Sequence, residues 1–261
     1  MSEQTQPEPP RPEREEAAGV EGAAGKGEPT HVLVRTAVLA GLTRLVPVPF
    51  LDDFLLRRAR KHQVDSLLEL HERSFPKGEV AALSSDSGSC LCGIVGFVVM
   101  LPITLLLKLL KIVFRTVFFV LAIRSAALVV ASTYMLGRTV HQELRGGSFA
   151  DAAQPPERVK EAQRVREAFE TTFTGSDWRL LVHAIGGAWS GARSMLRRGG
   201  SVAQAGLEED HEGELSGADQ AQVEALTAKV EEALQDEKVV GYLADFDRRF
   251  QAKLAELRAA P

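Results

Sequence analysis

Residues 92–136, CGIVGFVVMLPITLLLKLLKIVFRTVFFVLAIRSAALVVASTYML, form the longest apolar stretch of the chain, and their placement decides the fold. The 17 residues from Leu91 to Leu107 carry no charge, and residues 116–136 contain one charged side chain, Arg124. A helix needs about 17–25 mainly apolar residues to cross the hydrocarbon core of a bilayer. Both halves of the stretch therefore have the length of a membrane span.

Three arrangements of this stretch fit the sequence. The first is a membrane hairpin with crossings near 92–110 and 116–136, the second is one crossing followed by a helix on the membrane surface, and the third is a buried helical pair. An arginine near the middle of a span costs about 2.5–3.5 kcal/mol, which about five to ten strongly apolar neighbours offset. From Ile103 to Ile123, however, no Gly, Pro, Asn or Asp is present to reverse the chain. We expect the hairpin and keep the other two arrangements open.

Charge is distributed unevenly along the chain. Residues 81–145 carry six basic and two acidic side chains, whereas residues 201–261 carry six basic and 14 acidic side chains. A basic apolar segment suits an anionic lipid surface, and acidic ends are repelled by nucleic acid. We therefore expect a lipid bilayer as a partner and no nucleic acid.

Outside the apolar stretch the chain shows helical periodicity and no strand pattern. We predict an all-α protein with a central hydrophobic, transmembrane helical hairpin and a disordered N-terminal tail. Gly241 is a candidate interruption of the last helix. The expected segments are a disordered acidic tail at 1–30, a helical hairpin at 31–83, a hydrophobic membrane segment at 91–137, a helical pair at 155–198, a flexible linker at 199–218 and an amphipathic C-terminal helix at 219–258.

Known catalytic and cofactor motifs are incomplete in this sequence. Cys90 and Cys92 are the two cysteines of the chain, and two thiols alone do not complete a structural zinc site. The stretch GAAGKG, 22–27, resembles a phosphate-binding loop, but Val20 replaces its first glycine and Gly27 replaces the Ser or Thr that follows the lysine. We expect no catalytic residues, no cofactor-binding residues and no metal ligands.

A polar stripe on the helix near residue 70 is the alternative site. Its members are His62, Asp65, Glu69 and Glu72. The spacing i, i+3, i+7, i+10 places these four potential metal ligands on one side of a helix. The solvated face of an amphipathic helix has the same pattern, and a helix-borne metal site also needs ligands from a second helix. We interpret the stripe as a solvated face, with a metal site as the alternative.

The helix near residues 178–191 carries two further patterns. Its apolar stripe, which is typical of core packing, consists of Trp178, Val182, Ile185 and Trp189. Gly187 and Gly191 form a GxxxG spacing, which allows close contact between helices beside a membrane.

A resemblance covers residues 37–71. The pattern formed by Ala40, Gly41, Pro47, Pro49 and Asp52, followed by the helix at 54–72, is similar to the helical hairpins of EcsC-type proteins and of helical domains in some bacterial membrane-associated GTPases. The chain departs from that pattern in its doubled Asp52–Asp53 pair, which is also typical of a helix N-cap. The resemblance implies a bacterial, membrane-associated helical protein, and it brings no catalytic residues.

These observations lead to two functional hypotheses. The first is a non-enzymatic, membrane-anchored helical scaffold or binding protein in the inner membrane, with both termini on the cytoplasmic side and a protein partner bound through the C-terminal helix. The second is a membrane-associated enzyme or regulator that uses a metal site on the helix at His62–Glu72. A soluble helical protein with 92–136 as its buried core is the remaining alternative.

Overall fold

The computed structural model describes six stretches of the chain and one isolated residue. These are residues 29–44, 51–76, 78–84, 115–149, 154–189, 202 and 217–260, with no side-chain description at 51–53 and 115–122. Residues 1–28 of the tail predicted at 1–30, the first predicted crossing at 92–110 and most of the linker predicted at 199–218 lie outside the described residues. The last two residues of the predicted tail, Pro29 and Thr30, belong to a helix.

The described residues form helices and contain no strand, which confirms the all-α class. The helices are α1 (Pro29–Thr43), α2 (Leu51–Leu70), α3 (Ala81–Ser84), α5 (Arg115–Arg145), α6 (Pro155–Thr174), α7 (Arg179–Trp189), α9 (Gly217–Leu234) and α10 (Glu237–Ala259).

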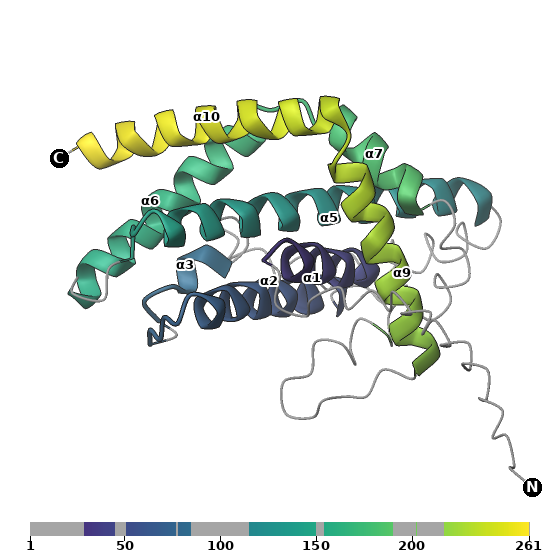
Figure 1. Cartoon of the computed structure of the whole chain (residues 1–261), viewed down its shortest axis with the longest axis horizontal. Helices are drawn as coiled ribbons and strands as arrows, with labels where there is room; N and C mark the ends of the chain where they lie inside the picture. Colours follow the sequence, from purple (N-terminus) through teal and green to yellow (C-terminus); the bar gives the residue numbers. More distant parts are fainter. Residues whose placement is uncertain are drawn as a thin grey trace, which may run out of the picture.

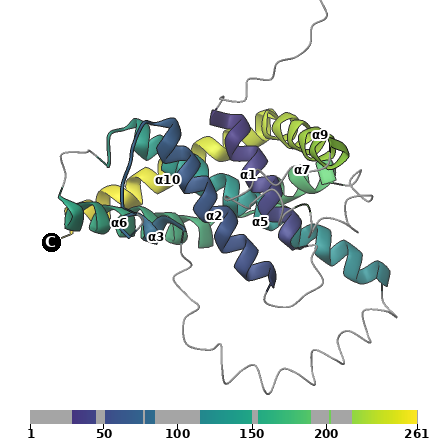
Figure 2. The same ribbon diagram turned by 90° about the horizontal axis from the view of Figure 1, so that it is seen from below.

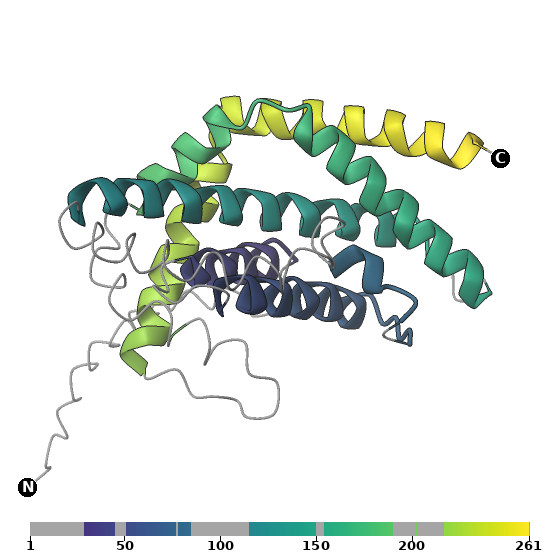
Figure 3. The ribbon, with the colours of Figure 1, turned by 180° about the vertical axis from the view of Figure 1, so that it is seen from behind.

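Helix α5 is the centre of the molecule. It runs between the α1–α2 pair and the α6–α10 pair, while α7 and α9 pack together at one end (Figure 1). Its 31 residues make it the longest described helix, and its N-terminal end projects beyond α1 and α2 in two views (Figures 2 and 3). The N-terminal helices and the helices that follow residue 115 therefore belong to one folded body.

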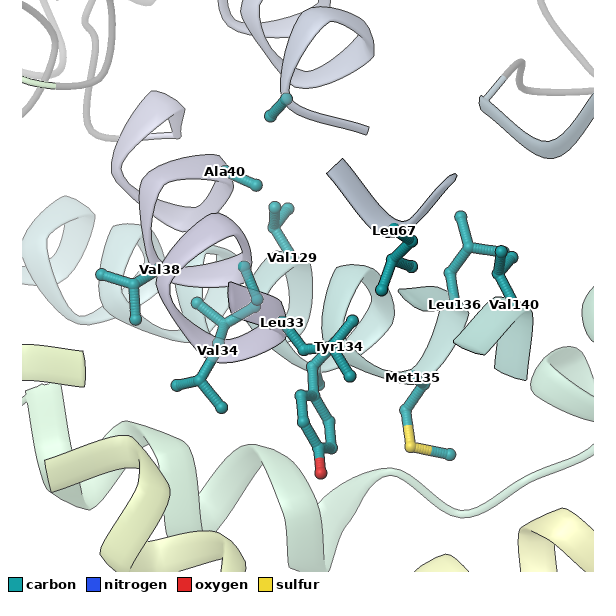
Figure 4. Packing of buried hydrophobic residues seen from close by; sticks show 14 of the residues in the cluster. Leu33, Val34, Val38, Ala40, Leu67, Val129, Tyr134, Met135, Leu136 and Val140 are labelled. Carbon is teal, nitrogen blue, oxygen red and sulfur yellow. The ribbon is translucent and has the colours of Figure 1, made fainter. Parts of the chain in front are cut away.

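The interior is formed mainly where α1 meets α5. Side chains of α1, α2 and α5 point toward one another there (Figure 4). Burying one such aliphatic side chain contributes about 1.5–3 kcal/mol. Those of α1 and α5 with no more than 1% exposure include Val34, Val38, Leu39, Met135, Leu136 and Val140.

Two glycines allow the central helices to approach closely. A Cβ atom added at Gly41 of α1 would lie 3.0 Å from the Trp189 ring and closer still to the Val130 side chain of α5. A Cβ atom added at Gly137 of α5 would lie 2.6 Å from the Leu33 side chain of α1 and would also clash with Gln63 of α2. The absence of a side chain at both positions is therefore a packing requirement.

The C-terminal helix predicted at 219–258 is two helices, which corrects the prediction. The break falls at Gln235–Asp236, between α9 and α10, and not at Gly241, which lies inside α10. Asp236 begins the second helix because its side chain accepts a hydrogen bond from the backbone N–H of Lys238 at 2.9 Å. An aspartate in this position satisfies a backbone donor that the helix leaves unpaired.

The apolar stripes of both C-terminal helices are buried in the chain's own core. Their buried apolar members are Val223, Leu226, Val230 and Leu234 of α9, and Val239, Leu243, Phe246, Phe250 and Leu254 of α10. Helix α10 packs mainly on α6, and α9 packs on α1 and α7. These stripes therefore contribute to the fold, and the predicted partner surface on the C-terminal helix does not include them.

The second predicted crossing, 116–136, is not supported. Within the described part of the chain, no helix is long and apolar enough to cross a membrane. From Ala126 to Leu136 nearly every side chain of α5 is buried or half-buried, and Arg124, the charged residue of the stretch, is exposed. A helix covered by other helices on most sides is apolar on most sides. For residues 126–136, burial in the protein accounts for the apolar composition.

Candidate functional site

Two of the hollows in the described residues and one histidine pair are the candidate sites. The first hollow lies between α1, α2 and α9 and has a volume of about 460 Å³; we call it the polar pocket. Its lining consists of His31, Val32, Arg35, Thr36, His62, Ser66, Glu69, Leu70, Gln220 and Glu224.

Ion pairs between α1 and α9 form one wall of the polar pocket. His31 Nε2 lies 3.3 Å from Glu224 Oε2, and His31 Nδ1 lies 3.1 Å from Glu231 Oε1. Arg35 Nε lies 3.3 Å from the other Glu224 oxygen. The basic groups of this wall therefore have carboxylate partners, and the wall links two helices.

The predicted polar stripe contributes only part of this pocket. His62 and Glu69 line it, whereas Asp65 and Glu72 do not. Glu72 follows the end of α2 with a φ of 55°, which takes it out of the helical stripe. Among the described residues, no group of three or more His, Cys, Asp or Glu side chains is arranged to hold a metal ion. The four stripe residues are thus not brought together.

A pair of histidines links the end of α2 to α5. His71 Nε2 and His141 Nδ1 are 3.0 Å apart, so one neutral ring donates its N–H to the other. Burial lowers the pKa of His71, and the charges of Arg145 and Arg73 lower it further. Burial also lowers the pKa of His141, assisted by His71, Arg145 and Arg138. The surrounding positive charge favours a neutral pair and opposes a bound cation.

The second hollow lies between the N-terminal half of α5 and the start of α7, and we call it the α5–α7 groove. It has a volume of about 760 Å³. Its lining consists of Ile123, Arg124, Ala127, Leu128, Ser176, Asp177, Trp178, Arg179, Val182, His183, Gly186 and Gly187. Most of these side chains are apolar or small, and the charged ones are three: Arg124, Asp177 and Arg179.

Aromatic packing supports one side of the groove. The Trp178 ring lies 3.5 Å from the Phe173 ring, centroid to centroid, and 6.4 Å from the rings of Tyr242 and Phe246. The predicted apolar stripe of this helix is divided between two roles. Ile185 and Trp189 are buried in the core. Trp178 and Val182 are half-buried and line the groove.

The glycines of α7 leave the groove open. Nothing lies within 4 Å of a Cβ atom added at Gly186 or Gly187, so no described helix uses the close approach that the GxxxG spacing would allow. Gly191 lies outside the described residues. The sequence indicated a small-residue surface at Gly187, but nothing in it indicated that α5 would form the opposite wall.

Residues far apart in sequence form both hollows, which explains why sequence patterns did not reveal them. His31 and Glu231 are separated by 200 positions, and neither shows a local pattern that points to the other.

Neither family models, nor curated proteins, nor solved structures match this chain.

Proposed function

We propose that this chain is a non-enzymatic helical protein that is anchored at a membrane and acts as a scaffold or binding protein. The observation that carries the proposal is the placement of the apolar segment 92–114. This segment continues directly into α5, the central helix of a folded body, and its first 16 residues carry no charge. The resemblance of residues 37–71 to EcsC-type helical hairpins implies a bacterial, membrane-associated protein. The proposal places the anchor in the inner membrane, with the body on the cytoplasmic side.

The fold restricts how the segment would meet a membrane. Helices α1 and α2 precede the segment and α5 follows it, yet α1 and α5 pack against each other throughout the core. The residues before and after the segment therefore lie on the same side of any bilayer. A single crossing would place them on opposite sides, so this packing argues against it.

The length of the segment argues against two complete crossings. Residues 85–114, between the described helices α3 and α5, number 30. Two helical spans need about 40 residues, and at least about 34 at the lower limit. A segment that enters and leaves the membrane at one face, either as a shallow hairpin or as a helix along the surface, fits both restrictions. This arrangement takes the place of the predicted hairpin, in which 116–136 was the second crossing.

Carbonate extraction of membranes from expressing cells tests the anchor. We expect the full-length chain to remain with the membranes. The double substitution Leu105→Asp and Leu106→Asp is expected to release it, because carboxylates are costly in hydrocarbon. The matched substitution Val240→Asp alters an apolar side chain of α10 that is 50% exposed, and it is expected to leave the chain bound. Complete release of the unmodified chain as a monodisperse protein would favour the buried-core alternative.

Cysteine labelling tests the one-face arrangement. In a chain with Cys90→Ser and Cys92→Ser, single cysteines at Lys111 and at Val240 are treated with an impermeant maleimide in inverted and in right-side-out vesicles. We expect both positions to react from the same side only. Labelling of position 111 from the side opposite to position 240 would support two complete crossings and refute insertion from one face.

A further inference from the structure

We propose that the α5–α7 groove is a second membrane contact, which binds the headgroups and outer acyl region of anionic phospholipids. The inference rests on the proposed membrane anchor, because the groove lies on the helix that follows the anchoring segment. It adds a described binding surface and a lipid class.

One exposed apolar side chain lines this groove and a second lies next to one of its lining residues. Leu128 on α5 is 42% exposed and Leu180 on α7 is 37% exposed. Leu128 lines the groove, and Leu180 adjoins Arg179 at the start of α7. Val182 and the open α7 glycines provide a surface without long polar side chains. An apolar surface of this kind, bordered by charge, is typical of sites for lipids or for other molecules.

The charge bordering the groove favours anions. Arg124 is exposed, and the Arg179 side chain is 89% exposed. Asp177 lies 3.9 Å from Arg179 and is itself 75% exposed, so this pair is weak and solvated. The two arginines outnumber the one aspartate of the groove, so it carries a net positive charge, which is attracted to the negative surface of an anionic bilayer. An exposed apolar surface with two arginines suits anionic lipid better than an acidic protein helix, because leucines can enter the acyl region while arginines stay at the phosphates.

The position of the groove on α5 determines the orientation of the body. Helix α5 starts at Arg115, and at 1.5 Å per residue Arg124 and Leu128 lie about 14 and 20 Å further along the axis. An upright α5 would carry both residues out of the headgroup layer, which extends only about 5–8 Å beyond the hydrocarbon on each side. The groove therefore contacts lipid only if α5 lies along the membrane surface.

A fluorescent probe at the groove tests this contact. The full-length chain, with Cys90→Ser and Cys92→Ser, carries a single environment-sensitive label at Leu180→Cys or, for comparison, at Val240→Cys. Both positions are exposed apolar sites. Leu180 is next to Arg179, which lines the groove, whereas Val240 lies on α10. The chains are mixed with vesicles of neutral phosphatidylcholine, or with vesicles that also contain phosphatidylglycerol, and emission and quenching by nitroxide lipids are recorded.

We expect a blue shift and quenching at position 180 in the phosphatidylglycerol vesicles, a smaller change in neutral vesicles, and no change at position 240. The double substitution Arg124→Gln and Arg179→Gln is expected to lower, by roughly 30-fold, the ratio of chains whose groove contacts the lipid to chains whose groove remains in water. Because both arginines are exposed, their replacement is expected to leave the far-UV circular dichroism unchanged.

The other outcomes separate this inference from the proposed function. A chain that stays with membranes in carbonate, but whose label at position 180 remains in water, would keep the anchor and overturn the groove contact. A chain that carbonate releases, but whose label still shifts with anionic vesicles, would overturn the anchor and keep the groove. Equal shifts in both vesicle types would overturn the preference for anionic lipid. A blue-shifted label before vesicles are added would mean that protein covers the groove, which would also overturn the inference.

Discussion

Replacement of Gly137 by alanine tests the close packing at the centre of the fold. In a helix interior this change alone is favourable by about 0.8–1 kcal/mol. Here the new methyl group would lie 2.6 Å from Leu33 Cδ2 and would also overlap the amide of Gln63, a fully buried side chain. Overpacking of this kind costs about 1–3 kcal/mol, and displacing a buried amide costs about 1–3 kcal/mol more. We expect a net loss of about 1–5 kcal/mol in the free energy of unfolding.

Gly241→Ala is the matched change, because Gly241 lies inside α10 and nothing lies within 4 Å of an added Cβ atom. We expect this variant to gain about 0.5–1 kcal/mol. Urea denaturation followed by circular dichroism measures the free energy of unfolding of both variants. In thermal unfolding, each kcal/mol corresponds to a shift of roughly 2–4 °C in Tm. If Gly137→Ala were as stable as Gly241→Ala, α1, α2 and α5 would not meet as closely as described.

Two further predictions concern polar links to α5. The pKa values of His71 and His141 are lowered in the folded chain. Below about pH 6.5 the unfolded chain therefore binds more protons than the folded chain. The free energy of unfolding should then fall as the pH is lowered, by at most about 1.4 kcal/mol per pH unit for each histidine. Replacing both histidines by glutamine should flatten this pH dependence in urea titrations from pH 7.5 to 5. An unchanged slope would show that the pair is not the source of the dependence. Arg138 donates to Asp247 at 2.7 Å across α5 and α10, with both side chains partly buried, so Asp247→Asn should cost about 1 kcal/mol, less at high salt. Asp245→Asn, which affects more exposed pairs within α10, should cost less than about 0.5 kcal/mol, and equal losses would show that the α5–α10 link adds nothing.

Local signals in the sequence predicted several helices well. Helix α6 was expected from residue 155, and it begins there with two prolines, which are tolerated in a first helical turn. It ends before Gly175, whose backbone N–H donates to the carbonyl of Thr171, while the N–H of Ser176 donates to that of Phe173. Helix α1 ends at Thr43, shortly before Pro47, and a residue before a proline is disfavoured in the helical region. Where starting and stopping residues are themselves in the sequence, the bounds follow to within a few positions.

The role of α5 could not be predicted in the same way. A helix that other helices surround and a helix that lipid surrounds have the same apolar composition, so the sequence 116–136 is consistent with both. The distinction depends on partners such as Leu33 and Trp189, which lie far away in sequence. The same reason explains why the polar pocket and the α5–α7 groove were not foreseen. The helix break at Asp236 had a local cause, but a single aspartate is also common in helix interiors.

The packing of α1 on α5 has a consequence for synthesis. Helix α1 ends at Thr43, and the buried face of α5 is complete only beyond Leu144. At about 5–20 residues per second, α1 waits roughly 5–20 s on the ribosome for the helix that covers it. Residues 92–114 emerge within that interval, when no finished core is yet available to them. If residues 92–114 anchor the chain as proposed, the order of translation gives a bilayer the first opportunity to receive this segment, before the folded body has closed.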